Sequence, residues 1–165
     1  MIKILGVDAS TTCSGYCFID ENGILLSHSV FNYRNKKDIQ ERIDLQIGEF
    51  IKLFKVEKPD ICYVENTWNK SNIETTKALT NIIGAIRCLC VGYKCGFNLV
   101  LPSVWRSVVG IDGGKNIKRD EFKKRAIAWV KDKYFLDVND DEAEAICIAY
   151  AGNILNNKMF EEELF

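Results

Sequence analysis

"YVENTW", residues 63–68, ends a run of apolar residues on a carboxylate and raises the first question about this chain. Tyr63 and Val64 are typical of the end of a buried β-strand, but Glu65 stands where another apolar residue would fit better. An unpaired carboxylate is costly to bury, so such a group usually shifts its pKa, pairs with a base or binds a metal. Glu65 is therefore the first candidate for a functional residue.

The composition around this stretch is that of an ordinary globular protein. The chain has 165 residues, of which 47% are hydrophobic and 27% are charged. This length can bury one substantial core, so we expect a single domain over residues 1–165. The chain begins directly with a strand-like segment, and no apolar stretch approaches the length of a membrane span. We therefore expect a cytoplasmic protein with no membrane partner.

Cysteine usage agrees with that location. The seven cysteines are an odd number without CxxC pairs, and His28 is the only histidine. A zinc site would depend on thiolates at unsuitable spacings, such as Cys88, Cys90 and Cys95. We interpret the cysteines as reduced, mostly buried thiols.

Hydrophobic periodicity predicts the order of the secondary structure. Strands are predicted for residues 2–11, 14–20, 24–33, 61–65 and 97–103. Helices are predicted for residues 38–55, 71–95, 105–109, 118–133 and 140–155. A hairpin meander, followed by alternating helices and strands, predicts an α/β fold: a mixed five-stranded sheet flanked by helices on both faces.

Charge is distributed unevenly, although the formal net charge is only -1. Residues 115–133 contain eight bases and three acids, whereas residues 137–165 contain eight acids and a single base, Lys158. A basic belt beside an acidic group suits a polyanion held by the first and a metal held by the second. A solvated helix face followed by an acidic tail is the alternative.

Four acids occupy positions that can bring them together. Asp8 and Glu65 end strands that, as parallel neighbours, would open at the same carboxyl edge of the sheet. Asp141 and Glu144 are three residues apart on the last helix and therefore share a face. Converging carboxylates repel one another, and hard divalent cations such as Mg²⁺ remove that repulsion. Two such ions, about 4 Å apart, are the known arrangement for in-line attack on a phosphodiester.

Three of these acids also have a purely structural interpretation. Asp8 precedes the hydroxyl residues 10–12 and can cap a turn. Asp141 and Glu144 can serve as the N-cap and the N3 residue of their helix. Glu65 has no comparable alternative, because glutamate is both a poor strand residue and a poor cap. Its presence favours the metal interpretation for the whole set.

Longer motifs surround these acids and resemble a known family. They are "ILGVDASTTCSGYCFID" (residues 4–20), "PDICYVENTW" (59–68), "SVWRSVVGIDGGK" (103–115) and "NDDEAEAICIAYAG" (139–152). In this order they resemble the RuvC Holliday-junction resolvases of the RNase H-like superfamily, over almost the whole chain. The resemblance implies a homodimer that binds a four-way DNA junction and makes two symmetrically related nicks in DNA recombination and repair.

The resemblance also implies the site residues. Asp8, Glu65, Asp141 and Glu144 would be the catalytic residues and the ligands of two Mg²⁺ or Mn²⁺ ions, and the product would carry a 5′-phosphate. Bacterial members have aspartate, sometimes histidine, where this chain has Glu144, and the adjacent Asp140 could substitute for Asp141. Because no histidine lies near these motifs in the sequence, a general base would be Glu144 or a neighbouring carboxylate.

Basic and aromatic residues near the motifs would bind the DNA. Bases of the helix at 118–133 can neutralise phosphates. Trp68 resembles the family's aromatic residue that stacks at the opened crossover, and a partly buried lid residue is its alternative. Trp105 stands where the family has a basic residue, and Arg106 next to it is a candidate replacement. The predicted DNA-binding residues are Trp68, Ser71, Asn72, Lys77, Arg106, Lys115, Lys118, Arg119 and Lys123.

Other functions are compatible with parts of this pattern. A non-catalytic junction-binding protein would use the acids only as caps, and another nuclease of the superfamily would cut flaps, forks or RNA–DNA hybrids. The segment at residues 6–15 also looks like the first phosphate loop of actin-like ATPases, but that fold needs two domains and 165 residues cannot hold them. Short, divergent members of the resolvase family occur in bacteriophages, so we expect a phage origin, action in the host cytoplasm and loose substrate choice.

Overall fold

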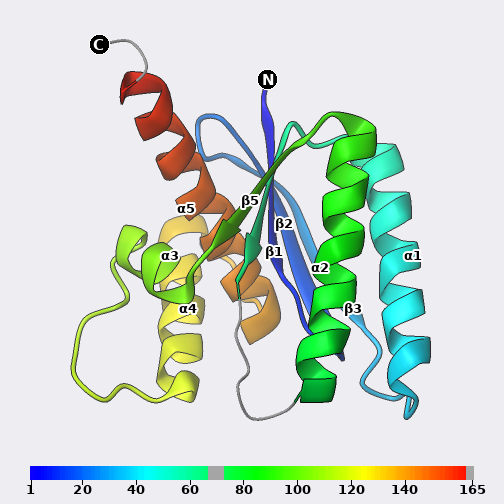
Figure 1. The fold of residues 1–165 in the computed structure, drawn as a ribbon. Coiled ribbons are helices and arrows are strands. Elements are labelled where there is room, and N and C mark those ends of the chain that lie inside the picture. The colour runs from blue at the N-terminus through cyan, green and yellow to red at the C-terminus, as the bar shows by residue number, and fades with distance from the viewer. Residues whose placement is uncertain (67–72, 163–165) are drawn as a thin grey trace.

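A computed structural model describes the backbone of residues 1–66 and 73–162, and the side chains of residues 1–66 and 73–158. Its strands are β1 (Lys3–Asp8), β2 (Cys13–Asp20), β3 (Leu25–Asn32), β4 (Ile61–Glu65) and β5 (Gly96–Val100) (Figure 1). Its helices are α1 (Ile39–Glu57), α2 (Ile73–Tyr93), α3 (Pro102–Val108), α4 (Arg119–Tyr134) and α5 (Asp140–Glu162).

The predicted elements form, but several of their ends differ from the prediction. β1 and β5 stop at Asp8 and Val100, each three residues before the predicted ends at residues 11 and 103. The largest differences among the helices are in α3 and α5. α3 begins at Pro102, several residues before the predicted start, because a proline in the first helical turn loses no hydrogen bond. α5 continues beyond the predicted end at residue 155. Neither shift moves the residues of the predicted site.

The strands form one mixed sheet in the order β3-β2-β1-β4-β5, which confirms the predicted architecture. β1, β2 and β3 are antiparallel neighbours, whereas β4 pairs in parallel with both β1 and β5. In the β1–β4 pair Val7 lies opposite Val64. The next residue of each strand is a carboxylate, so Asp8 and Glu65 end neighbouring strands at one edge.

Helices cover both faces of the sheet (Figure 1). Leu5 of β1 belongs to the core shared with α1 and α2. Ile4 and Tyr63 belong to the core on the opposite face, with α3, α4 and α5. Because successive strand residues point to opposite faces, Asp8 and Glu65 point to the same side as Ile4 and Tyr63, toward α5.

α5 is the central helix of its layer. It lies against β1 and β2 on one side and against α3 and α4 on the other. Its first half is lined with small and apolar side chains that are 0% exposed, namely Ala143, Ala145, Ile146, Cys147, Ile148, Ala149 and Ala151. No helix within the described residues combines the length and apolarity needed to cross a lipid bilayer.

Two strand glycines allow α5 to approach the sheet closely. A Cβ atom on Gly6 would lie 2.3 Å from the backbone nitrogen of Ala149. A Cβ atom on Gly15 would lie 2.1 Å from the backbone oxygen of Asp141. Neither approach is compatible with a side chain, so the glycines set the distance between the helix and the sheet. Glycine inside a strand often marks such a close approach.

We therefore predict that Gly15→Ala separates α5 from the sheet. The clash is with backbone, which cannot rotate away, so the free energy of unfolding should fall by about 3 kcal/mol or more. Thermal unfolding followed by circular dichroism should then show a melting temperature lower by about 6–12 °C.

The matched control is Gly48→Ala in α1, where nothing lies within 4 Å of the added carbon. A glycine inside a helix costs stability, so this variant should be equal to the wild type or more stable by up to about 1 kcal/mol. If Gly15→Ala melts at the same temperature as Gly48→Ala, the close contact between β2 and α5 is not present in solution.

Candidate active site

The carboxylate of Glu65, which ends β4 within "YVENTW", contacts an indole. Glu65 and Asp8 are 5% and 7% exposed, and both point to the α5 side of the sheet. Oε2 of Glu65 accepts a hydrogen bond of 2.6 Å from Nε1 of Trp105. Trp105 lies on α3 and is fully buried. A donor that is itself held in the core fixes the position of the Glu65 carboxylate.

The first turn of α5 is capped without Asp141 and Glu144. The backbone nitrogen of Glu142 donates to Oδ1 of Asn139 at 2.9 Å, and Oε2 of Glu142 accepts from the backbone nitrogen of Asn139 at 3.4 Å. This reciprocal pair is a capping box. The alternative that Asp141 and Glu144 are the N-cap and N3 residues is therefore wrong. Both are buried, at 6% and 3% exposure.

Serines, and not Asp8, close the turn between β1 and β2. Oγ of Ser10 accepts from the backbone nitrogens of Thr12 at 3.3 Å and Cys13 at 3.4 Å. Oγ of Ser14 accepts from the backbone nitrogen of Ser10 at 3.0 Å. The turn-capping role considered for Asp8 is thus filled by other residues.

Asp8, Glu65, Asp141 and Glu144 form what we call the acidic cluster. Burial, followed by the charges of the other three, raises the pKa of Asp8 well above its usual range. Burial and the charge of Glu65 raise the pKa of Glu144 to about 7. Burial also raises the pKa of Glu65, although the hydrogen bond from Trp105 opposes this change. The structure therefore brings the four predicted acids together, and they repel one another.

Two arginines form ion pairs with members of the cluster, and the charge of Arg119 also opposes the rise in the pKa of Asp8. Nη2 of Arg34, in the segment after β3, donates to Oδ2 of Asp141. Nη2 of Arg106 lies 3.8 Å from Oε1 of Glu144. Arg106 also stacks on the ring of Phe122, 4.3 Å from its centroid, and only 17% of its side chain is exposed.

Asp140 occupies a different environment from its neighbour. Its Oδ2 accepts from Nζ of Lys123 on α4, and 33% of its side chain is exposed. That ion pair lowers the pKa of Asp140. Asp140 therefore faces α4, whereas Asp141 faces the acidic cluster, and this arrangement favours Asp141 as the functional residue of the pair.

The donors of the acidic cluster fit a hard divalent cation. They are carboxylate oxygens in a buried site, where Mg²⁺ or Mn²⁺ would offset the burial and the repulsion that raise the pKa of Asp8 and Glu144. Among the described residues, no three His, Cys, Asp or Glu side chains already form a group that could hold a metal ion. In this arrangement Asp141 is paired with Arg34, and Glu65 with Trp105.

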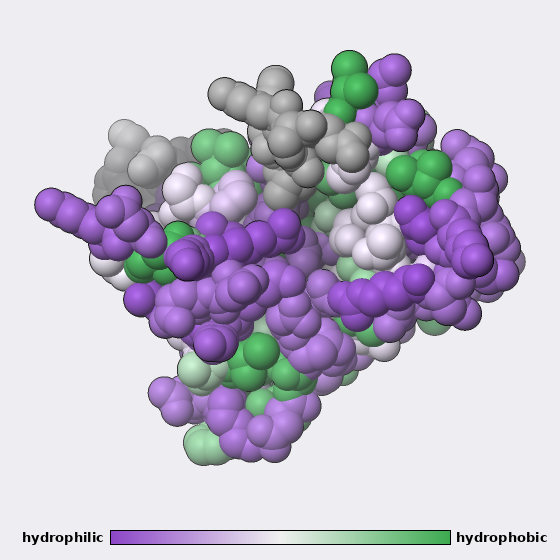
Figure 2. Space-filling view, turned by 90° about the horizontal axis from the view of Figure 1, so that it is seen from below, coloured by the Kyte–Doolittle hydropathy of each residue, from purple (hydrophilic) through white to green (hydrophobic). Residues whose placement is uncertain are grey.

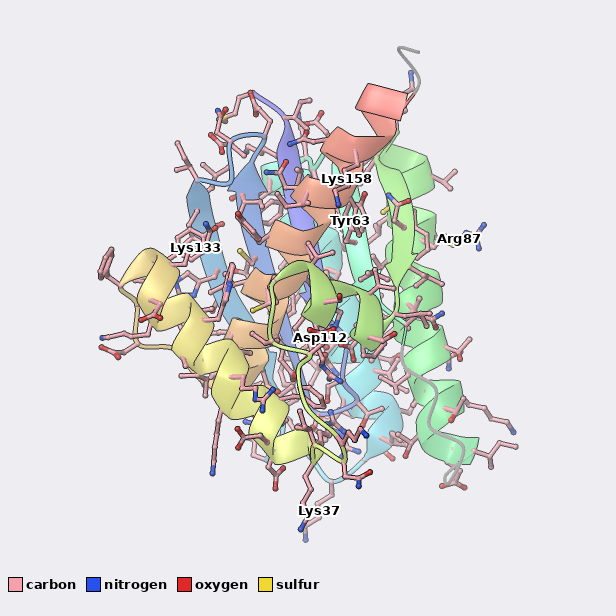
Figure 3. The ribbon with its side chains drawn as sticks, turned by 90° about the vertical axis from the view of Figure 1, so that its left-hand side faces the viewer. Lys37, Tyr63, Arg87, Asp112, Lys133 and Lys158 are labelled. Atoms are coloured by element: carbon pink, nitrogen blue, oxygen red, sulfur yellow. The ribbon has the colours of Figure 1, made fainter. Side chains whose placement is uncertain are left out.

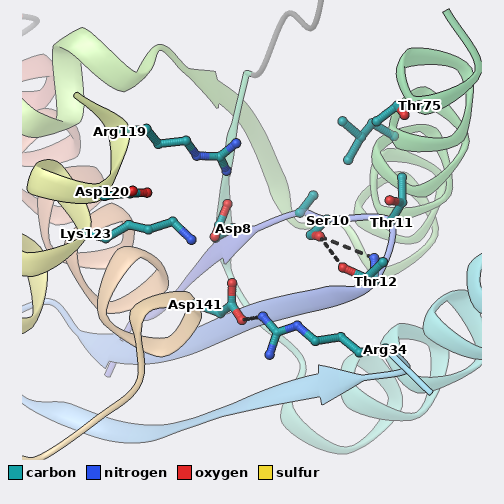
Figure 4. Close-up of a pocket in the computed structure, with 12 residues that line it drawn as sticks. Asp8, Ser10, Thr11, Thr12, Arg34, Thr75, Arg119, Asp120, Lys123 and Asp141 are labelled. Carbon is teal, nitrogen blue, oxygen red and sulfur yellow. Dashed lines mark hydrogen bonds and ion pairs between the residues drawn. The ribbon is translucent and has the colours of Figure 1, made fainter. Parts of the chain in front are cut away.

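A pocket of about 610 Å³ opens beside the acidic cluster. Asp8 and Asp141 lie on its floor, with Arg119 and Lys123 of α4 on one side and Arg34 on the other (Figure 4). Hydroxyls from the β1–β2 turn also line it, together with Thr75 and Leu79 of α2. The surface at this end of the molecule is largely hydrophilic (Figure 2). An open, polar, basic-walled pocket suits an extended polyanion better than an apolar ligand.

The predicted DNA-binding residues fall into four groups. Lys123 is mostly buried and paired with Asp140. Lys115, Lys118 and Arg119 are exposed near the start of α4, and Lys77 is exposed on α2. Arg106 is mostly buried against Glu144, and a contact with DNA stays a prediction for it. Trp68, Ser71 and Asn72 lie outside the described residues.

Sequence reasoning missed several neighbours of the acidic cluster. Trp105 was noted only because a basic residue is expected at its position, yet it is the donor to Glu65. Nothing in the sequence pointed to Arg34, which lies 107 residues from its partner. The sequence has no histidine close to the motifs along the chain. In the fold, however, Nδ1 of His28 lies 2.9 Å from Oε1 of Glu142, so a histidine does contact the last motif.

We predict that Trp105→Phe weakens metal binding. The change keeps an aromatic ring in the core but removes the N–H that orients Glu65. Loss of such an outer partner typically costs 10- to 100-fold in metal affinity, so Mn²⁺ affinity measured by titration calorimetry should fall by about 10-fold.

Trp129→Phe is the control for this variant. Trp129 packs against Tyr134 and Tyr150 on α4 and α5, and its ring contacts within the described part of the chain include no member of the acidic cluster. Its Mn²⁺ affinity should match that of the wild type. Equal affinities for the two variants would show that the hydrogen bond to Glu65 is not needed to position this ligand.

We also predict that the stability of the folded chain depends on pH through Glu144. The ordinary pKa of Glu144 is 4.5 and its folded value is about 7, so its protonated form stabilises the folded chain. This contribution is complete below about pH 4.5 and is lost as the pH rises through about 7. In the presence of a chelator, the melting temperature should therefore fall between about pH 5.5 and pH 8.

Mg²⁺ should reverse this loss, because the cation replaces protons on the carboxylates. About 10 mM Mg²⁺ should raise the melting temperature more at about pH 8 than at about pH 5.5. Glu144→Gln should flatten the pH dependence measured in chelator. A melting temperature that rises with pH across this interval in the wild type would contradict the mutual repulsion of the cluster.

No model of a known protein family matches this chain, but individual proteins do. Two relatives are each named crossover junction endodeoxyribonuclease RuvC. The one from Thermosipho melanesiensis is 26% identical over 88 residues, which cover 52% of this chain and 56% of the relative. The one from Rickettsia akari is 23% identical over 158 residues, which cover 94% of this chain and 99% of the relative.

Solved structures match the fold over nearly the whole chain. RuvC of Thermus thermophilus in complex with a Holliday junction substrate has a TM-score of 0.77 at 14% identity and covers 96% of both chains. The yeast mitochondrial Holliday junction resolvase has a TM-score of 0.60 at 17% identity, covering 99% of this chain and 85% of that one. The chain is therefore similar to RuvC in sequence and has the RNase H-like fold that the resemblance implied.

Proposed function

We propose that this chain is a metal-dependent endonuclease that resolves four-way and other branched DNA junctions by paired symmetrical nicks. The observation that carries the proposal is the acidic cluster, in which strand ends and one helix turn supply four buried carboxylates beside a basic-walled pocket. Buried acids that repel one another are unfavourable without a cationic partner. The similarity to RuvC in sequence and fold supports the same function.

Residues of this chain would bind the metal ions and accept a proton. Asp8, Glu65, Asp141 and Glu144 would hold two Mg²⁺ or Mn²⁺ ions through carboxylate oxygens. When bound, such ions supply Lewis-acid activation of water and charge stabilisation at the leaving 3′-oxygen, which leaves a 5′-phosphate. Glu144 or a neighbouring carboxylate of the cluster would accept the proton of the attacking water.

Other residues would position the reacting groups. Trp105 holds Glu65 by the hydrogen bond of 2.6 Å, and Arg106 lies beside Glu144. Lys115, Lys118, Arg119 and Lys123 would neutralise phosphates along the DNA backbone. Lys77, Ser71 and Asn72 would contact phosphate at the start of α2, and Trp68 would stack on an opened base. These base and phosphate contacts fix the DNA without reading its sequence.

The proposed active form is a homodimer. One chain has one acidic cluster, and a pair of symmetrical nicks in a four-way junction requires two clusters related by a two-fold axis. The proposed setting is the cytoplasm of a bacterial host, with a phage as the source of the gene.

The decisive experiment compares branched and unbranched DNA as substrates. The wild type should nick a labelled four-way junction in Mg²⁺ or Mn²⁺ faster than a fork, a flap or a linear duplex, with 5′-phosphate ends. Glu65→Gln and Glu144→Gln should each reduce cleavage by about 1,000-fold, because each removes a carboxylate charge from the metal site. Junction binding in Ca²⁺ should stay close to that of the wild type, because bases and not these acids hold the phosphates.

Glu142→Gln is the control, since Glu142 is adjacent to Asp141 but caps the helix and contacts His28. It should cleave like the wild type. Junction binding without nicking by the wild type would favour a non-catalytic binding protein. Faster cleavage of flaps, forks or RNA–DNA hybrids would assign the same site to a different nuclease specificity.

A further inference from the structure

Arg34 enters the pocket from a wall that the sequence did not indicate. Its guanidinium donates to Asp141, one of the four acids of the cluster, through Nη2 (Figure 4). The two partners differ in exposure: 54% of the Arg34 side chain is exposed, against 9% of the Asp141 side chain. Arg34 thus combines a contact with a buried ligand candidate and access to whatever occupies the pocket.

The segment that carries Arg34 is fixed to the rest of the site. The backbone nitrogen of Tyr33 donates to the oxygen of Thr12 at 2.8 Å, which ties the segment to the β1–β2 turn. Arg42 of α1 donates to the backbone oxygen of Thr11 at 2.9 Å and to that of Lys36 at 2.7 Å. Arg42 therefore joins the turn and the segment on either side of the pocket rim, and Arg34 projects from a braced backbone.

The bases of the pocket approach from two sides. Arg119 and Lys123 come from α4, and Arg34 faces them from across Asp8 and Asp141 (Figure 4). Lys123 is already paired with Asp140, which lies outside the acidic cluster. Of the three described bases that line the pocket, Arg34 is the one that forms an ion pair with a member of the acidic cluster. A cation bound by the cluster would therefore compete with Arg34 for the carboxylate of Asp141.

The guanidinium has unused donors. Within residues 1–66 and 73–158, its hydrogen-bonding partner is Oδ2 of Asp141, reached by Nη2. Arginine carries five N–H donors in a planar fork that matches the oxygens of a phosphate. A lysine would neutralise Asp141 as a point charge but would not offer this geometry.

We propose that Arg34 is a phosphate-binding residue of the cleavage reaction, an inference that rests on the proposed function. In the absence of metal, Arg34 neutralises Asp141. With the Asp141 carboxylate held by a divalent cation, the Arg34 guanidinium would be free to donate to a non-bridging oxygen of the phosphate to be cleaved. Arg34 then stabilises the charge that builds up on the phosphate oxygens during attack.

The test uses Arg34→Ala, Arg34→Lys and the control Lys37→Ala. Lys37 is an exposed base of the same segment and lies at the lower end of the molecule in Figure 3. It has no contact with Asp141 among the described residues, so its removal changes the local charge without changing the pair. Thermal unfolding of each variant verifies that the fold is retained.

One measurement tests whether Arg34 competes with metal for Asp141, and a second tests whether Arg34 acts on the phosphate. Without DNA, Arg34→Ala should bind Mn²⁺ several-fold more tightly than the wild type, because a competing cation is gone. At saturating Mn²⁺ and junction, its single-turnover cleavage rate should fall by about 100-fold, the usual effect of losing one donor to a developing charge. Arg34→Lys should recover part of the rate, and Lys37→Ala should cleave at the wild-type rate.

Each opposite result overturns the proposal. Wild-type cleavage by Arg34→Ala at saturating Mn²⁺ would make Arg34 a counter-ion with no role toward phosphate, while leaving the nuclease function intact. Unchanged Mn²⁺ affinity in Arg34→Ala would show that the pair with Asp141 does not compete with metal. A wild-type protein that nicks no branched DNA would overturn the proposed function, and the role of Arg34 with it.

Discussion

The close contact between α5 and the β1–β2 strands is the constraint on which the rest of the structure depends. Gly6 and Gly15 carry no side chains that would hold the helix away from the sheet. The small residues Ala145 and Ala149 of α5 lie against them. Only at this separation does the first turn of α5 reach the carboxyl ends of β1 and β4. The packing of small residues, which carry no chemistry themselves, thus determines where the acids meet.

The acidic cluster is unfavourable as it stands, and the surrounding residues reflect this. Four carboxylates are removed from water in one place, and burial raises the pKa of several of them. Arg34, Arg106 and Trp105 each supply a positive charge or a donor to one member. These partners offset only part of the repulsion. A divalent cation would offset the remainder, so folding and metal binding are expected to be coupled through the same four side chains.

The fold separates tasks between elements. Strand ends and the first turn of α5 carry the buried acids, where the backbone is rigid and the side chains are held within the core. The bases come from α4 and from the segments between elements, where long side chains can reach a phosphate and still contact solvent. Buried acids held by rigid elements keep a strict arrangement, and the more exposed bases remain accessible from solvent.

The sequence by itself predicted the elements and the mixed sheet, because strand alternation and helix periodicity are local properties. It also supplied the candidate acids of the cluster. It also identified Glu65 as anomalous, since a carboxylate at the end of an apolar strand is unusual on local grounds alone. It did not decide which of Asp140 and Asp141 faces the cluster, because both lie in one helix turn and only the position of Lys123 on another helix separates them. Nor did it indicate Trp105 and Arg34 as partners of Glu65 and Asp141, which lie 40 and 107 residues away. Such pairs are made by the packing of whole elements against one another, and no periodicity in the chain encodes them.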